Sequence, residues 1–334
     1  MENRIKFIDY AKGIGIILVL LGHSEIIGLP KIWLYSFHMP LFFFLTGLVI
    51  NINLKRYKSF IKKRIKSLLI PFFCFSIILL FKDFLLIIIG NKDFNEIFYD
   101  LLGTLLQMRA TDFSGSFWFL PVIFEVNIIL LIEEYISSKI KRKYTEYIFS
   151  LICFIIGYTV ITVLKYPLLW NFDAALIATS FAILGKCTKN IFIKSSINIS
   201  LLKKYKLIVG FLLINFIVGL INSILINNSI DLYWSRLGNP IFYLIAAYAG
   251  IFMILIFSMI IKSSYLNFAG QNSLLFYCIH HEFLFPIIKK FLSLFNVDET
   301  FFYYPYIITI IMCITLIPFC KIINRYIPIL AGKY

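Results

Sequence analysis

Apolar residues dominate this chain in long runs that are separated by short polar segments. Runs of about 17–25 apolar residues are long enough to cross a bilayer as α-helices. Ten such runs lie at approximately 13–29, 32–52, 67–89, 117–136, 147–164, 168–185, 207–227, 240–261, 271–288 and 303–321. The pattern predicts an all-α fold, a polytopic membrane helical bundle of about ten transmembrane helices, with residues 1–334 forming one integral-membrane domain.

The composition supports a membrane protein and excludes a soluble globular one. Hydrophobic residues make up 60% of the chain and charged residues 15%, whereas soluble domains carry about 25% charged residues. The formal net charge of +15 does not indicate a nucleic-acid partner. The lysines and arginines cluster in the polar segments between apolar runs, as they do in cytoplasmic loops. We therefore expect contact with membrane lipid and none with nucleic acid.

The distribution of basic residues also predicts the orientation. Most of the 32 lysines and arginines fall in segments that a cytoplasmic N-terminus would place inside, chiefly 4–12, 55–66, 139–143 and 186–206. Because basic loops stay on the cytoplasmic side, both termini are expected in the cytoplasm. The abundance of Ile, Lys, Asn, Phe and Tyr is typical of an AT-rich coding sequence. It suggests a bacterial source and hence the cell (plasma or inner) membrane.

The cysteines give no sign of a metal site. There are six, at 74, 153, 187, 278, 313 and 320, and they form no CxxC pair. Most lie inside apolar runs, where a cysteine behaves as a small hydrophobic residue. We therefore expect neither a metal ion nor a disulfide framework.

One titratable residue, Lys12, directly precedes the first apolar run, and another, His23, lies within it. Lys12 and His23 are eleven positions apart, which at about 100° per residue brings them to within about 20° of the same side of a helix. Asp9, three residues before Lys12, lies on nearly that side. The rise of roughly 16 Å between Lys12 and His23 would place the lysine at the cytoplasmic edge and the histidine past mid-depth.

A second histidine, His38, lies within the next apolar run. His23 and His38 are symmetric about Pro30 and Lys31, so a helical hairpin that turns there would hold both rings at similar depth. A charged group in hydrocarbon costs roughly 2.5–3.5 kcal/mol, so intramembrane titratable residues favour function. The alternative is that each histidine only hydrogen-bonds a neighbouring helix.

Two later stretches add candidates. Glu125 follows Trp118-Phe-Leu-Pro121, and it would orient a histidine, bind hydroxyls of an acceptor, or make a structural hydrogen bond. His280 shares a helical face with Ser273 and Tyr277, whereas His281 would point about 100° away. His280 is therefore the functional candidate of that pair, and the polar start of the run at 271–273 has the composition of a helix cap.

Several of these stretches together resemble acyltransferase family 3, a family of bacterial membrane acyltransferases, and particularly its fucose 4-O-acetylase-like branch. The first motif of that family is a basic residue, ten arbitrary positions and a histidine, which here is Lys12-x10-His23. The resemblance continues through Phe37-His38-Met-Pro40-Leu-Phe-Phe-Phe-Leu-Thr46-Gly47, where the family more often has Ser in place of Thr46. Later motifs match at 118–121 and 272–280.

The resemblance implies transfer of an acyl group, usually acetyl, from cytoplasmic acyl-CoA to a hydroxyl of an envelope glycan. Lys12, with Asp9 beside it, would meet the CoA phosphates, and His23 would act as general base, with His38 and His280 as further catalytic candidates. Some relatives carry Trp-Ser-Leu-x-x-Glu, whereas Glu125 stands seven residues after Trp118, so a catalytic role for Glu125 departs from that pattern.

The sequence therefore predicts a membrane O-acetyltransferase that uses acetyl-CoA as co-substrate and modifies a cell-surface polysaccharide or its lipid-linked sugar precursor. The alternative from another class is a lipid-linked sugar exporter, in which buried histidines and a basic inner edge simply line a pathway. The Lys12-to-His23 spacing favours the enzyme, because transport does not require it.

Overall fold

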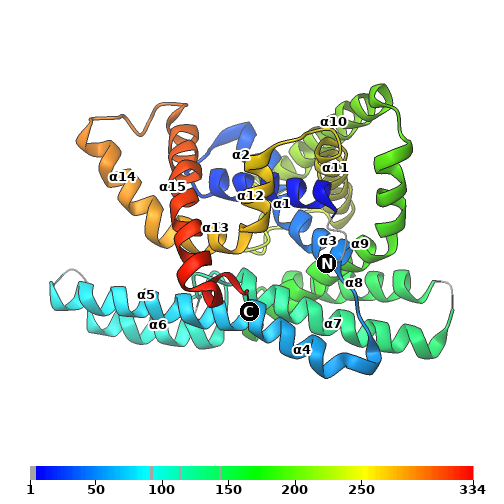
Figure 1. Cartoon of the computed structure of the whole chain (residues 1–334), viewed down its shortest axis with the longest axis horizontal. Helices are drawn as coiled ribbons and strands as arrows, with labels where there is room; N and C mark the ends of the chain where they lie inside the picture. Colours follow the sequence, from blue (N-terminus) through cyan, green and yellow to red (C-terminus); the bar gives the residue numbers. More distant parts are fainter. Residues whose placement is uncertain (1–4, 91–92, 113, 143, 334) are drawn as a thin grey trace. The chain divides into compact units, whose positions relative to one another are not determined.

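The computed structural model describes residues 5–90, 93–112, 114–142 and 144–333. Residues 4 and 143, which belong to two of the basic segments, lie outside this described part. The described chain is mainly α-helical (Figure 1). Its only β-type pairing there is an isolated bridge between Asp231 and Arg236. The all-α prediction is confirmed.

The helices up to the middle of the chain are α1 (Lys6–Gly22), α2 (Gly28–Tyr35), α3 (His38–Val49), α4 (Tyr57–Arg64), α5 (Ile70–Ile88), α6 (Phe94–Leu106), α7 (Phe119–Ile140) and α8 (Thr145–Leu164). The later ones are α9 (Phe172–Asn198), α10 (Leu201–Leu225), α11 (Pro240–Ser258), α12 (Ser264–Gln271), α13 (Ser273–Ile279), α14 (Phe285–Leu294) and α15 (Tyr304–Tyr326). Two π-helical turns, Ile65–Leu69 and His280–Leu284, and three 3-10 turns, Leu54–Arg56, Leu169–Asn171 and Pro328–Ala331, complete the described elements.

The chain divides into two compact units. Unit 1 consists of Met1–Leu45, Asn190–Leu232 and Arg236–Arg325, and unit 2 of Thr46–Lys189, Tyr233–Ser235 and Tyr326–Tyr334. Unit 1 is thus assembled from the start of the chain and its second half, while unit 2 comes mostly from the middle. The single integral-membrane domain over residues 1–334 stays a prediction.

Unit 1 is built around α1, which packs along α12, while α10 and α11 lie side by side (Figure 1). Glycines allow these close approaches. A Cβ on Gly13 would overlap the backbone of Leu266 in α12, and a Cβ on Gly250 in α11 would overlap the ring of Phe37. The small residues therefore serve helix packing in this unit, as they commonly do in membrane bundles.

Unit 2 packs its helices through small residues in the same way. A Cβ on Gly47 would overlap the backbone of α9 at Ala182. Ser150 of α8 donates a hydrogen bond to the backbone carbonyl of Ser180 at 3.1 Å. Helix α6 starts with a capping box formed by Asp93 and Glu96.

Among the described residues, seven helical segments are long and apolar enough to cross a membrane: Gly28–Val49, Leu54–Ile88, Thr145–Leu164, Leu169–Ile193, Leu201–Leu225, Pro240–Ser258 and Tyr304–Tyr326. On α8, apolar side chains at 148, 151, 152, 155 and 156 are each about half exposed. Their spacing follows one side of a helix, which is the pattern of a lipid-facing surface. The full count of ten spans and the orientation stay predictions.

One expected boundary is wrong. The first run was expected to continue to residue 29 and to turn at Pro30, but α1 ends at Gly22 and α2 already contains Pro30. Proline is compatible with the first turn of a helix, because the N–H it lacks has no intrahelical acceptor there. The chain instead bends between the two helices, where Glu25 and Gly28 have φ values of 63° and 69°.

Candidate functional site

The end of α1 carries the residue around which the site is organised. His23 is the C-terminal cap residue of α1, and its backbone N–H bonds the carbonyls of Val19 and Leu20. The position of α1 is fixed by its crossing with α12, since neither Gly13 nor Gly270 has room for a Cβ there. His23 is therefore held at a defined point of unit 1 and remains partly exposed.

His280 forms a direct hydrogen bond with His23. The distance from His280 Nε2 to His23 Nδ1 is 2.8 Å, and the rings are 23° from coplanar with centroids 4.9 Å apart. This is the geometry of two rings that meet edge to edge through an in-plane N–H···N bond. Two histidines that are 257 positions apart in the chain thus form one pair.

The partners of His280 determine which nitrogen of His23 is basic. His280 Nδ1 lies 2.9 Å from the carbonyl oxygen of Phe276 and 2.8 Å from that of Tyr277. Carbonyl oxygens only accept, so Nδ1 of His280 carries the hydrogen and its Nε2 is an acceptor. His23 must then donate from Nδ1, which leaves the lone pair on His23 Nε2.

A π-helical turn, His280–Leu284, follows α13 and changes the direction of the side chains after Ile279. Pro286 stands in the first turn of α14 directly after it. A proline inside a helix cannot donate to the carbonyl four residues earlier and its ring clashes with that carbonyl, and a widened turn relieves both problems. The other π turn, Ile65–Leu69, is likewise followed by a proline, Pro71.

This π turn brings a third imidazole to His23. The rings of His281 and His23 meet edge to face, with centroids 4.9 Å apart and planes at 71°. Consecutive residues of a regular α-helix point about 100° apart, which is why His281 was expected to face away. That expectation is wrong.

His38 lies at the start of α3 and is buried, with 5% of its surface exposed. Its Nδ1 donates to the carbonyl of Leu34 at 3.0 Å, so its Nε2 also carries a lone pair. Tyr35 connects His38 with the end of α1. The Tyr35 ring packs edge-on against His38 at 4.9 Å, and its hydroxyl donates to the carbonyl of Gly22 at 3.0 Å.

An ion-pair cluster lies beside the histidines. Lys289 of α14 is 3.1 Å from a carboxylate oxygen of Glu25 and 3.0 Å from one of Glu299. Both carboxylates accept hydrogen bonds from the ammonium and raise its pKa. The cluster ties the bend after α1 to the segment between α14 and α15.

Asp9 and Lys12, the residues expected to serve CoA binding, lie on α1 one helical turn apart. Asp9 is buried and Lys12 is half-buried. Both make contacts of their own within the protein. Their place on α1, the helix that ends at His23, agrees with the helical stripe inferred from the sequence.

Glu125, the remaining predicted site residue, lies on α7 in unit 2 and has different neighbours. Its Oε2 is buried and has no hydrogen-bond partner in the part of the chain that the structure describes. A buried ion pair is nearby: the guanidinium of Arg109 makes bonds of 2.9 and 2.6 Å to the two carboxylate oxygens of Asp173. Arg109 also donates from its backbone and side chain to Asn171.

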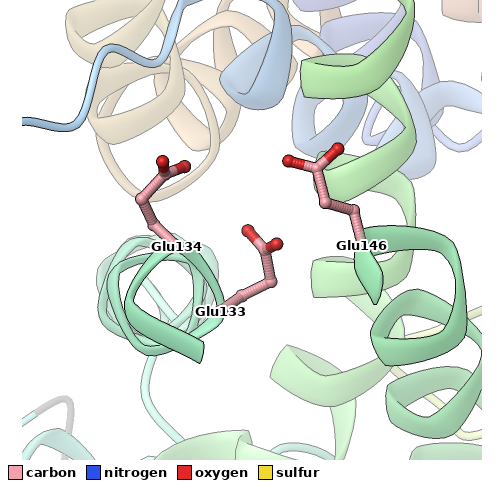
Figure 2. Close-up of side chains that lie close together, drawn as sticks. All are labelled: Glu133, Glu134 and Glu146. Carbon is pink, nitrogen blue, oxygen red and sulfur yellow. The ribbon is translucent and has the colours of Figure 1, made fainter. Parts of the chain in front are cut away.

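A group of three carboxylates in unit 2 has the spacing of a metal site. Figure 2 shows Glu133 and Glu134 of α7 and Glu146 of α8 gathered at one place. The ammonium of Lys186 on α9 lies among them, at 2.6, 2.8 and 3.0 Å from their oxygens. The lysine supplies the cation here, so the cluster joins three helices electrostatically.

The structure therefore brings His23, His38 and His280 together in unit 1, as the sequence suggested for the first two. It adds His281 and Tyr35, which sequence reasoning missed. The tandem histidines followed by a proline were the available signal for His281. In the polar stretch 271–273, Asn272 is the N-terminal cap residue of α13. Its side chain does not bond the first backbone N–H groups of that helix, and bonds Phe268 and Asn324 instead.

Chemically, the cluster offers a base with an oriented lone pair. When one ring nitrogen of a neutral imidazole donates its N–H to a fixed acceptor, the other nitrogen has the lone pair and can accept a proton from a substrate. Here the pinning group is a second imidazole in place of the more usual carboxylate. The arrangement suits deprotonation of a hydroxyl that attacks an acyl carbon.

Comparison with known proteins bears directly on this chemistry. The family model described as an acyltransferase domain matches residues 5–320. The match includes all of the histidines and extends over both units. Comparison with curated proteins and with solved structures gives no match.

Proposed function

Because the chain belongs to acyltransferase family 3 and is a multi-pass membrane protein, we propose that it is an O-acetyltransferase. It moves an acetyl group from cytoplasmic acetyl-CoA to a hydroxyl of a cell-surface polysaccharide or of its lipid-linked precursor, in the cell membrane of a bacterium. Acetyl-CoA is its co-substrate, and His23 is its general base.

The observation that carries this proposal is the hydrogen bond from His23 Nδ1 to His280 Nε2. It holds the His23 ring in one orientation with the lone pair on Nε2. A sugar hydroxyl is a weak nucleophile at neutral pH and gains reactivity as its proton is removed during attack. A positioned imidazole typically contributes 10²–10⁴-fold to such a step.

The donor is bound along α1 in this proposal. Lys12 provides a positive point charge for a CoA phosphate, and Asp9, one turn earlier, positions the lysine. The eleven residues from Lys12 to His23 span roughly 16 Å of helix, a distance that an extended pantetheine arm can bridge. Helix α1 thereby sets the distance between the lysine that contacts the phosphate and the histidine that acts as base.

The acceptor hydroxyl meets His23 from the side of Nε2. His38 has its own free Nε2 and is connected to the end of α1 through Tyr35, so it is suited to orient the acceptor or its partner. Glu125 has an unpartnered buried oxygen within the described residues, and its catalytic role stays a prediction.

The test uses membranes from cells that produce the chain and from matched cells that do not. Both are incubated with acetyl-CoA labelled in the acetyl group, and label is measured in the glycan and lipid-linked sugar fractions. We expect label only with the chain present, in a form released by mild alkali, as an O-acetyl ester is. Equal label in both membranes would refute the proposed function.

His23→Gln tests the base within that assay. Glutamine keeps a hydrogen-bonding side chain of similar size but does not accept a proton near neutral pH. We expect normal membrane insertion, retained acetyl-CoA binding and a loss of transfer of about 10²–10⁴-fold. Lys290→Gln, an exposed substitution on α14, is the control. Retention of more than about a tenth of wild-type transfer would remove the base assignment.

A further inference from the structure

His281 is placed by the π turn against the ring that serves as base. Its centroid is 4.9 Å from that of His23, in an edge-to-face contact. The side chain of His281 is 50% exposed, whereas His280 is only 1% exposed. Of the two consecutive histidines, one is thus enclosed in the protein and the other is open to a substrate.

The neighbours of His281 fix its ring and its tautomer. Its Nδ1 lies 3.1 Å from a carboxylate oxygen of Glu282. A carboxylate accepts a hydrogen bond, so Nδ1 carries the hydrogen and Nε2 is the nitrogen left for chemistry. The ring of Phe285 lies nearly parallel to the imidazole, with planes at 7° and centroids 6.0 Å apart. His281 therefore presents Nε2 from a ring held on two sides.

Two available imidazole nitrogens, Nε2 of His23 and Nε2 of His281, thus belong to rings in contact. Glu282 can form an ion pair with His281 when that ring carries a second proton. Lys289 is already engaged by Glu25 and Glu299. His281 is consequently the group beside His23 that is best suited to release a proton to a substrate.

We propose that His281 is the general acid of the acyl transfer and protonates the departing CoA thiolate; this rests on the proposed function. The hydroxyl gives its proton to His23 Nε2 as its oxygen bonds the thioester carbon. His281 starts as the doubly protonated imidazolium paired with Glu282. The C–S bond then breaks, its electron pair goes to sulfur, and sulfur takes the proton from His281 Nε2. The proton on His23 passes to His281, which restores both rings. The net reaction converts hydroxyl and acyl-CoA into ester and CoA thiol.

The need for a second ring follows from the way His23 is held. The attacking oxygen and the leaving sulfur occupy different corners of the tetrahedral intermediate. A single base that serves both must reach both corners from one nitrogen, and the hydrogen bond to His280 restrains the ring of His23. His281 approaches His23 at 71° to its plane and can meet a second corner without such movement.

The experiment compares two acetyl donors that differ in their leaving groups. Acetyl-CoA releases a basic thiolate, whereas S-(4-nitrophenyl) thioacetate releases a weakly basic one that needs no proton. In His281→Gln we expect the maximal transfer rate from acetyl-CoA to fall by about 10²-fold, and the rate from the nitrophenyl donor to fall by less than a tenth of that factor. Equal losses with both donors, or no loss with acetyl-CoA, would overturn the proposal.

Two further variants keep the test decisive. His281→Ala leaves space for free imidazole, so added imidazole should restore transfer from acetyl-CoA, and absence of rescue in a folded variant would count against the proposal. His23→Gln should lose transfer from both donors. Equal transfer by membranes with and without the chain refutes the proposed function, and full transfer by His23→Gln removes the base assignment. A donor-independent loss in His281→Gln rejects only the role of His281. Gel-filtration elution and thermal unfolding in detergent establish that each variant is folded.

Discussion

In the proposed mechanism His280 sets the tautomer of His23, and substitution of His280 gives a graded prediction. In His280→Leu the partly buried Nδ1–H of His23 loses the acceptor that it has 2.8 Å away in His280. Leaving a buried donor without a partner costs about 1–3 kcal/mol. At about 1.4 kcal/mol per tenfold change, transfer should fall by roughly 5- to 150-fold. The loss should appear in kcat and leave the KM for acetyl-CoA unchanged, because the donor phosphates are proposed to bind near Lys12.

Replacing His280 by two amides of different length separates the loss of the hydrogen-bond acceptor for His23 from the loss of side-chain volume. In His280→Gln the amide oxygen reaches the position of Nε2 and can accept from His23, so most of the activity should remain. In His280→Asn the shorter amide reaches only the position of Nδ1, where it can bond the carbonyl of Phe276 but leaves His23 without an acceptor. Asn should therefore resemble Leu.

The assay is transfer of labelled acetyl to the acceptor fraction, with kcat and KM determined separately and thermal unfolding measured for each variant. The double variant His23→Gln/His280→Leu should be no slower than His23→Gln alone, because the two residues act as a unit. Equal activity of His280→Gln and His280→Leu, or an effect confined to KM, would refute the tautomer argument.

Three other predictions address donor binding, stability and topology. Lys12→Ala should raise the KM for acetyl-CoA, whereas Lys12→Arg, which keeps the charge, should be milder, and an unchanged KM in Lys12→Ala would exclude the lysine from donor binding. Lys186→Met leaves the fully buried Glu133 without its cation and should destabilise the protein by about 3–5 kcal/mol, seen as a lower unfolding temperature in detergent; an unchanged temperature would contradict this. Reporter fusions should place the loops near residues 60, 142 and 200 in the cytoplasm, and finding one of them outside would disprove the ten-span topology.

Patterns within single segments were reliable guides to the fold. Long apolar runs predicted helices because a backbone in lipid must satisfy its own hydrogen bonds, and the described chain is mainly α-helical. The boundary near Pro30 was missed because proline ends a helix in its interior but suits its first turn. Whether Pro30 lies inside a helix or in its first turn depends on where the preceding helix ends, and the apolar content of the sequence does not reveal that position.

The sequence also identified the main residues of the site. The spacing of Lys12 and His23 follows from helical periodicity alone, and isolated histidines in apolar runs are costly enough to attract attention. Sequence reasoning could not assign a direction to His281, because it assumed a regular helix. The π turn before Pro286 replaced that geometry.

The sequence by itself determined that this is an all-helical membrane protein with titratable residues on its first helix, because hydrophobicity and helical period act between near neighbours. Only the tertiary structure decided which histidines meet and which nitrogen of His23 is basic. That outcome depends on the close crossing of α1 and α12 at Gly13 and Gly270 and on two backbone carbonyls of α13. Contacts across 257 positions arise from packing, and no local pattern encodes them.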